Sequence, residues 1–103
     1  MKLTIISSDG AVYVDGEVQS GLVLNQLPNN VHALQWNEDS GWIEFVNDAN
    51  GIRQDNEKIK VLPEWATLCL DAWNAAKIEK AAFLASAPQV PLQQPTVNGS
   101  QTL

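Results

Sequence analysis

The sequence predicts an α+β fold, in which a small antiparallel β-sheet packs against one C-terminal amphipathic helix and an extended tail follows. Three patterns support this. Short alternating apolar segments are separated by turn pairs up to about residue 62. Apolar residues then recur every three or four positions, and residues 86–103 carry no charged side chain. The 103 residues fit one domain, with a β-rich head and helix in 1–85 and an uncharged Pro/Gln-rich extended tail in 86–103.

The first part of the head is predicted to be a short β meander. Leu3 and Ile5 alternate with polar or smaller residues, and Asp-Gly pairs at 9–10 and 15–16 are typical of tight turns between antiparallel strands. The strands are expected near 2–7, 11–14 and 17–20.

Two tryptophan-bearing segments form the next predicted hairpin. Leu34 and Trp36 share one face of the first strand, while Trp42 lies on the face opposite Ile43 and Phe45 in the second. The apolar face of each strand is expected to pack on the helix. The predicted strands are 31–36 and 42–46, joined by a turn at 37–41 and followed by a polar loop at 47–57 and a short last strand near 58–62.

Pro63 is expected to open the helix, because proline suits the first helical position and Glu64 beside it favours the helix dipole. The helix is predicted to end near Leu84, and its alanine-rich second half, 75–85, is expected to project beyond the head. The apolar residues that recur at helical spacing are Trp65, Leu68, Cys69, Ala72, Trp73 and Ala76.

The far part of the helix and the tail are the predicted contact surface for a partner protein. The tryptophans are read first as core residues, and the alternative is that one of them is an interface anchor, since tryptophan often dominates binding hot spots; Trp73, furthest along the helix, is the best candidate. The tail either has no role or lies as an extended segment in a groove or at a sheet edge of the partner. The predicted interface residues are Trp73, Ile78, Phe83, Leu84, Val90, Leu92 and Val97.

The charge balance disfavours two classes of partner. Twelve acidic residues oppose six basic ones, and the formal net charge is −6. Binding to nucleic acid or to an anionic membrane surface relies on clustered Lys and Arg, so neither is expected. The single cysteine, Cys69, excludes an intrachain disulfide and fits a protein assembled in a reducing cytoplasm.

Enzyme chemistry has no evident site in the sequence, and neither a metal nor a cofactor is predicted. His32 is the only histidine and is read as a structural strand residue, because no serine stands in a recognisable nucleophile motif. Cys69 lies on the inner helix face and reads as a buried small hydrophobe. The acidic segment 48–55 matches the spacing of a calcium loop only faintly, with Arg53 inside it.

Three segments together resemble small proteins encoded among the tail genes of tailed bacteriophages. They are the opening Met-Lys-Leu-Thr-Ile-Ile, the two tryptophan segments at 32–37 and 40–45, and the Val-Leu-Pro-Glu-Trp-Ala run at 61–66, which Trp73 and an alanine-rich stretch follow. The resemblance covers roughly residues 1–80. It implies a role near the tail fibres or baseplate of the virion, with other tail proteins as partners and a homo-oligomer possible, and it brings no catalytic residues.

Three functions are compatible with this reading. The first is a non-enzymatic structural tail protein that binds fibre or baseplate components through its helix and tail. The second is a tail-fibre assembly chaperone that is absent from the mature virion. The third is a small acidic inhibitor of a host enzyme.

Overall fold

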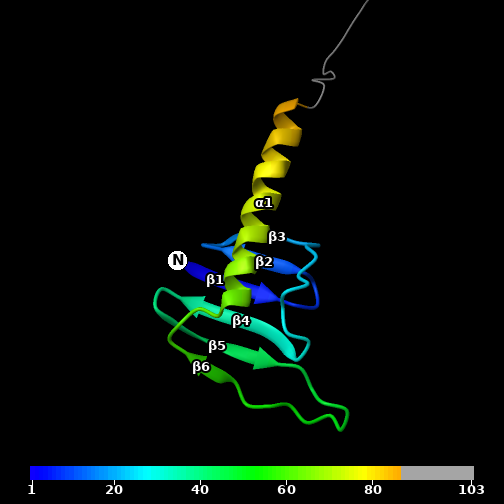
Figure 1. The fold of residues 1–103 in the computed structure, drawn as a ribbon, viewed down its shortest axis with the longest axis vertical. Coiled ribbons are helices and arrows are strands. Elements are labelled where there is room, and N and C mark those ends of the chain that lie inside the picture. The colour runs from blue at the N-terminus through cyan, green and yellow to red at the C-terminus, as the bar shows by residue number, and fades with distance from the viewer. Residues whose placement is uncertain (87–103) are drawn as a thin grey trace, which may run out of the picture.

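The computed structural model describes residues 1–86 and contains one six-stranded antiparallel sheet and one helix (Figure 1). The strand order is β3-β2-β1-β4-β5-β6, so β1 and β4 lie at the centre and are the one neighbouring pair that is not consecutive in the chain. The elements are β1 Lys2–Ile6, β2 Ala11–Val14, β3 Glu17–Gln19, β4 Val31–Asn37, β5 Ser40–Phe45, β6 Glu57–Ile59 and α1 Glu64–Ser86.

The predicted α+β class and the order of elements are confirmed, and the differences lie at element ends. The last strand ends at Ile59 and does not reach residue 62. The helix begins at Glu64, one residue after Pro63, because the Pro63 carbonyl accepts the first helical hydrogen bonds, from Ala66 N at 3.0 Å and Thr67 N at 3.2 Å. Proline therefore stands just before the first helical residue.

The inner face of the sheet, the face on which α1 lies, carries the apolar core. Leu3 pairs with Val14 on one side and with Trp36 on the other. The apolar residues of β1 and of the second half of β4 alternate with residues that face away from the core, as the period of a β-strand requires. A register irregularity between Val31 and Ala33 lets Val31 join the core as well. The buried core cluster consists of Leu3, Ile5, Val12, Val31, Leu34, Trp36, Ile43, Phe45, Ala66, Cys69 and Trp73.

A close approach between β4 and β5 depends on a glycine. Gly41 pairs with Trp36, and a Cβ atom at this position would collide with the backbone carbonyl of Gln35. Gly41 therefore lets the two tryptophan-bearing strands come together directly after their turn. The turn between β2 and β3 depends on backbone conformation instead. Asp15 and Gly16 both have positive φ (50° and 88°), which is the conformation of a type I′ hairpin turn.

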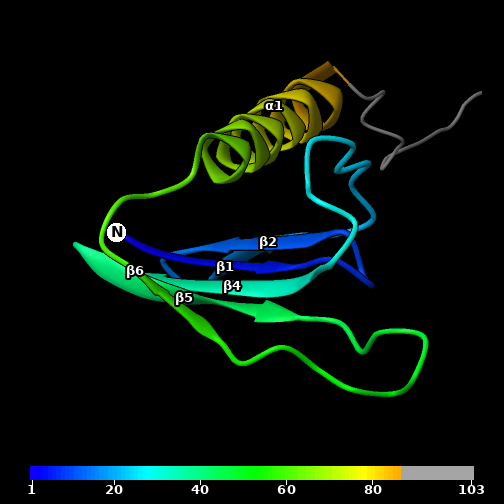
Figure 2. The ribbon, with the colours of Figure 1, turned by 60° about the horizontal axis from the view of Figure 1, so that its bottom comes forward.

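The helix crosses the inner face of the sheet and continues past the edge strand β3 (Figures 1 and 2). Ala66 and Cys69 are small, fully buried residues, and they let the first half of α1 lie close to the strands. Trp73 fills the wider space near the edge, and its Nε1 donates a hydrogen bond of 2.9 Å to the backbone carbonyl of Glu17 in β3.

This position corrects the prediction that Trp73 is an interface anchor. The side chain is buried between α1 and the sheet and belongs to the core cluster, so no partner can reach it while the helix stays docked. The physical reason is the width of the sheet. The strands β1, β2 and β3 extend under the helix as far as Trp73, and the helix first clears the sheet beyond that residue.

If Trp73 is a core residue, replacing it should chiefly cost stability. Trp73→Ala is expected to lower the free energy of unfolding by about 3–5 kcal/mol, as large-to-small core substitutions do. Trp73→Phe, which keeps most of the volume and loses the hydrogen bond to Glu17, should cost less, about 1–2 kcal/mol. Urea denaturation followed by circular dichroism measures both values. A loss below about 1 kcal/mol for Trp73→Ala would contradict the core assignment.

Candidate docking surface at the free helix end

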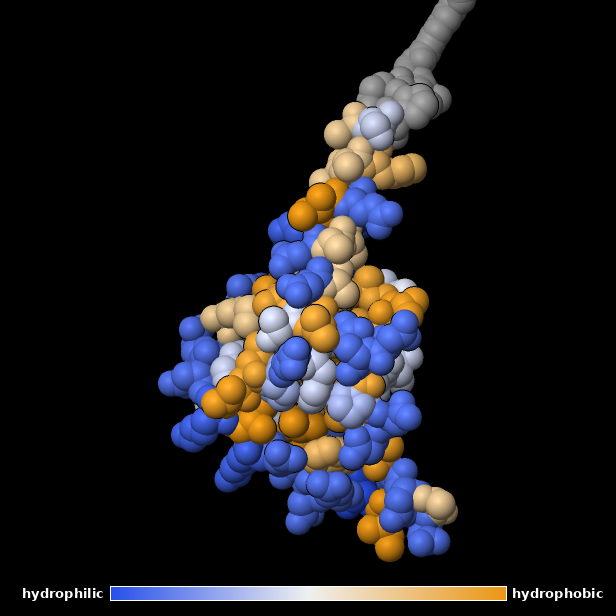
Figure 3. All heavy atoms as spheres, in the orientation of Figure 1, coloured by the Kyte–Doolittle hydropathy of each residue, from blue (hydrophilic) through white to orange (hydrophobic). Residues whose placement is uncertain are grey.

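The last ten residues of α1, 77–86, project beyond the sheet, and we refer to them as the free helix end. All ten are exposed, whereas Trp73 just before them is buried. At a rise of about 1.5 Å per residue the free helix end is about 15 Å long, roughly the width of three strands. In Figure 3 it stands clear of the body and carries hydrophobic surface beside hydrophilic surface.

Three predicted interface residues lie on the free helix end. Ile78 is 69% exposed, Phe83 68% and Leu84 60%, which are high values for large apolar side chains in a helix. The structure therefore brings these three together on one projecting element. The predicted interface residues Val90, Leu92 and Val97 lie outside the described residues.

Phe83 continues the stripe by which the helix packs on the sheet. The residues Ala66, Cys69, Trp73, Ala76, Lys80 and Phe83 follow one another at steps of three and four, the spacing that keeps side chains on one face of a helix. Up to Ala76 this stripe is buried or half-buried, and beyond it the sheet ends. Past the β3 edge the stripe continues with one charged residue, Lys80, and one large apolar residue, Phe83, whose ring is left open to solvent.

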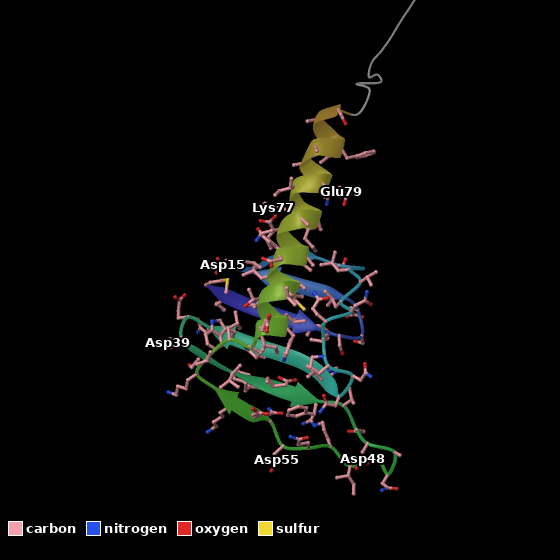
Figure 4. The ribbon with its side chains drawn as sticks, in the orientation of Figure 1. Asp15, Asp39, Asp48, Asp55, Lys77 and Glu79 are labelled. Atoms are coloured by element: carbon pink, nitrogen blue, oxygen red, sulfur yellow. The ribbon has the colours of Figure 1, made fainter. Side chains whose placement is uncertain are left out.

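The root of the free helix end is held by electrostatic contacts with β3. The Lys77 ammonium lies 3.1 Å from the Glu17 carboxylate and 5.0 Å from the centre of the Trp73 ring (Figure 4). Both charged side chains are half-exposed, so solvent screens the ion pair and its contribution is small, typically below about 1 kcal/mol. Together with the Trp73 hydrogen bond it sets the point at which the helix leaves the sheet.

In the described part of the chain, the histidine and the acidic residues do not come together as a catalytic site. His32 is half-buried beside a shallow hollow, and the hollow's other lining residues, Phe45, Val46, Asn47 and Arg53, include no nucleophile. Figure 4 shows Asp39, Asp48 and Asp55 well apart from one another. Within residues 1–86 no group of three or more His, Cys, Asp or Glu side chains is placed to hold a metal ion.

Asp48 has a structural use that accounts for its position in the acidic loop. Its Oδ1 accepts hydrogen bonds from the backbone N–H groups of Asn50 (2.8 Å) and Ile52 (2.9 Å). This is the side-chain pattern of an Asx-type turn. The carboxylate that the sequence offered as a first calcium ligand is therefore occupied in closing the loop.

The chain was compared with protein families, curated proteins and solved structures. No protein-family model, no curated protein and no solved structure matches it. In residues 1–86 no helix combines the length and apolarity that a membrane crossing would need.

Sequence reasoning missed one surface. The outer face of the sheet, the face turned away from α1, exposes the rings of Tyr13 and Trp42. The alternation in 42–46 placed Trp42 opposite Ile43 and Phe45, and the register confirms that separation. The strand order that brings the two rings onto one surface has no counterpart in the sequence pattern.

Burial makes Cys69 a poor nucleophile and gives a direct test of the helix position. Desolvation raises the pKa of the Cys69 thiol to about 11 from its ordinary value of 9.0. The folded thiol should therefore react with iodoacetamide at pH 8.5 far more slowly than the thiol of the urea-unfolded chain. Mass spectrometry of the alkylated protein measures both rates. Because the folded pKa is the higher one, the free energy of unfolding should also fall as the pH rises from about 9 towards 11. Equal labelling rates in the folded and unfolded states would contradict the burial.

Proposed function

We propose that this protein is a non-enzymatic docking protein that binds a partner protein through the free helix end and the segment that follows it. The observation that carries the proposal is the exposure of Ile78, Phe83 and Leu84 on a helix that outreaches its own sheet. Phe83 and Leu84 are neighbours in the chain, and Ile78 lies on another side of the helix, so exposed apolar side chains surround this element. Exposed large apolar side chains that gather on one projecting element mark an interaction site. An amphipathic helix laid against an apolar groove is a common mode of recognition.

The resemblance to phage tail-region proteins supports a proposal about which proteins are the partners. Residues that resemble small tail-region proteins of tailed bacteriophages run through the sheet and the first half of α1. We therefore place the proposed partner among tail-fibre or baseplate proteins, with the docking event in the host cytoplasm and the protein in the virion tail. In this proposal the sheet is a support that presents the helix, and the helix makes the contact.

The proposal predicts that two exposed residues matter for binding and not for folding. The full-length protein carrying Phe83→Asp and Leu84→Asp should keep its free energy of unfolding within about 1 kcal/mol, because both side chains are exposed. Recovery of fibre or baseplate proteins with the tagged protein from phage-infected cells should fall at least about tenfold, the effect of losing interface anchors. Quantitative mass spectrometry of the copurified proteins measures that recovery.

The control is Ile52→Asp, which places one aspartate, the same kind of substitution, on an exposed apolar residue in the loop between β5 and β6. This variant should recover the partner as the wild type does. Unchanged recovery with the double helix variant would refute the proposed function. Mass spectrometry of purified virions separates a structural protein, which stays in the particle in stoichiometric amount, from an assembly chaperone, which is missing from it.

A further inference from the structure

One row of residues crosses the whole outer face of the sheet. The registers of the five strand pairs join one residue of each strand to the next: Val18, Tyr13, Thr4, Gln35, Trp42 and Lys58. In the described part of the chain no helix lies on this face, because α1 packs on the inner one (Figure 2). The row is therefore an open strip whose order is fixed by backbone pairing.

The strip has an aromatic ring on each side of a polar centre. Tyr13 is 39% exposed and Trp42 43% exposed. They stand on β2 and β5, three strand spacings apart, which is about 14 Å. Between them Thr4 Oγ1 donates a hydrogen bond of 2.9 Å to Gln35 Oε1, a contact that leaves the Gln35 amide protons available.

Each ring borders a hollow, and the indole of Trp42 is also held by a hydrogen bond. Trp42 Nε1 donates a hydrogen bond of 2.8 Å to Glu44 Oε2 on the same strand face, which restrains the indole. A hollow of about 590 Å³ beside Trp42 is lined in part by Ser40 and Lys58. A second hollow of about 520 Å³ beside Tyr13 is lined by Lys2, Thr4, Tyr13, Asp15 and Gly16. Both are shallow and open to solvent, unlike the enclosed pockets of small cofactors.

We propose that the outer face binds an extended neutral oligosaccharide, with one sugar unit stacked on Tyr13, another on Trp42, and the units between them hydrogen-bonded at Thr4 and Gln35. A sugar ring offers a C–H face that packs on an aromatic ring and a rim of hydroxyl groups that pairs with amides, hydroxyls and carboxylates. The spacing of the rings suits a chain of several units. This site is separate from the free helix end and does not rest on the proposed docking function.

The charge of this surface argues against single-stranded RNA, the other kind of ligand that stacks on aromatic rings of a sheet. Single-stranded RNA also uses aromatic platforms, but it relies on a basic groove along its phosphates. Here the strip carries one cation, Lys58, and the further lysines of the two hollows, Lys2 and Lys60, are matched there by Asp15, Glu38 and Asp39. Trp42 is bonded to the carboxylate of Glu44, and the protein has a net charge of −6. A neutral sugar chain meets no such penalty, and the carboxylate accepts hydrogen bonds from its hydroxyls.

The test titrates the full-length protein with four neutral hexasaccharides, cellohexaose, maltohexaose, chitohexaose and mannohexaose, by isothermal calorimetry. At least one should bind with a Kd of about 1 mM or tighter. Trp42→Ala and Tyr13→Ala should each weaken that binding about fivefold to tenfold, and the double variant should abolish it. Trp42→Phe, which keeps a ring, should recover most of the affinity, so that a loss of stacking is distinguished from a loss of folding.

The controls are Ile52→Ala and the Phe83→Asp, Leu84→Asp variant, both of which should bind the sugar as the wild type does. The second control separates this site from the docking function, since each can fail without the other. The proposal is overturned if none of the four sugars binds, if the Tyr13→Ala, Trp42→Ala variant still binds, or if a hexauridine probe binds in their place.

Discussion

The contact between Trp73 and the edge strand β3 fixes where α1 lies on the sheet. Trp73 is the largest buried residue of α1, and its Nε1 is bonded to the Glu17 carbonyl at the outermost strand, while Trp65 packs against the core in a half-buried position at the start of the helix. The other two buried helix residues, Ala66 and Cys69, are small and let the helix come close to the strands without fixing its position along them. With Trp73 seated at the edge, residues 77–86 lie beyond the sheet and are exposed. The free helix end is a consequence of this one position.

The helix crosses the strands, and its backbone lies closest to β2 and β3, the strands at the edge where Trp73 is bonded. Side chains of α1 and of the central strands meet in the shared core. About 80 residues bury only a modest core, and the half-buried leucines of the loop between β3 and β4 complete it on the inner face. The outer face is left uncovered, as is common for antiparallel sheets. Here it carries two half-exposed aromatic rings among its polar residues.

Local signals in the sequence were sufficient for the elements and insufficient for their arrangement. The Asp15-Gly16 turn, Pro63 before the helix and the three-four periodicity from Trp65 act over a few residues, and the elements they predict are confirmed. Trp73 was open to two interpretations, because helical periodicity marks the apolar face without showing where the sheet beneath it ends. That boundary depends on β1 pairing with β4, a contact between segments about thirty residues apart. The alignment of Tyr13 with Trp42 depends on the same pairing.

The two exposed surfaces differ in chemistry because they arise differently. The free helix end exposes Ile78, Phe83 and Leu84 among charged residues and continues the stripe by which the helix packs, so it suits another protein surface that offers both apolar and charged contacts. The strip on the outer face alternates rings with amide and hydroxyl groups at positions fixed by strand register, so it suits a ligand that is itself amphipathic along its length. They lie on different parts of the molecule, one past the β3 edge and one on the sheet face turned away from α1. A protein of this size can therefore hold a partner at its helix and leave its sheet face open to a second ligand, provided the helix stays docked at Trp73.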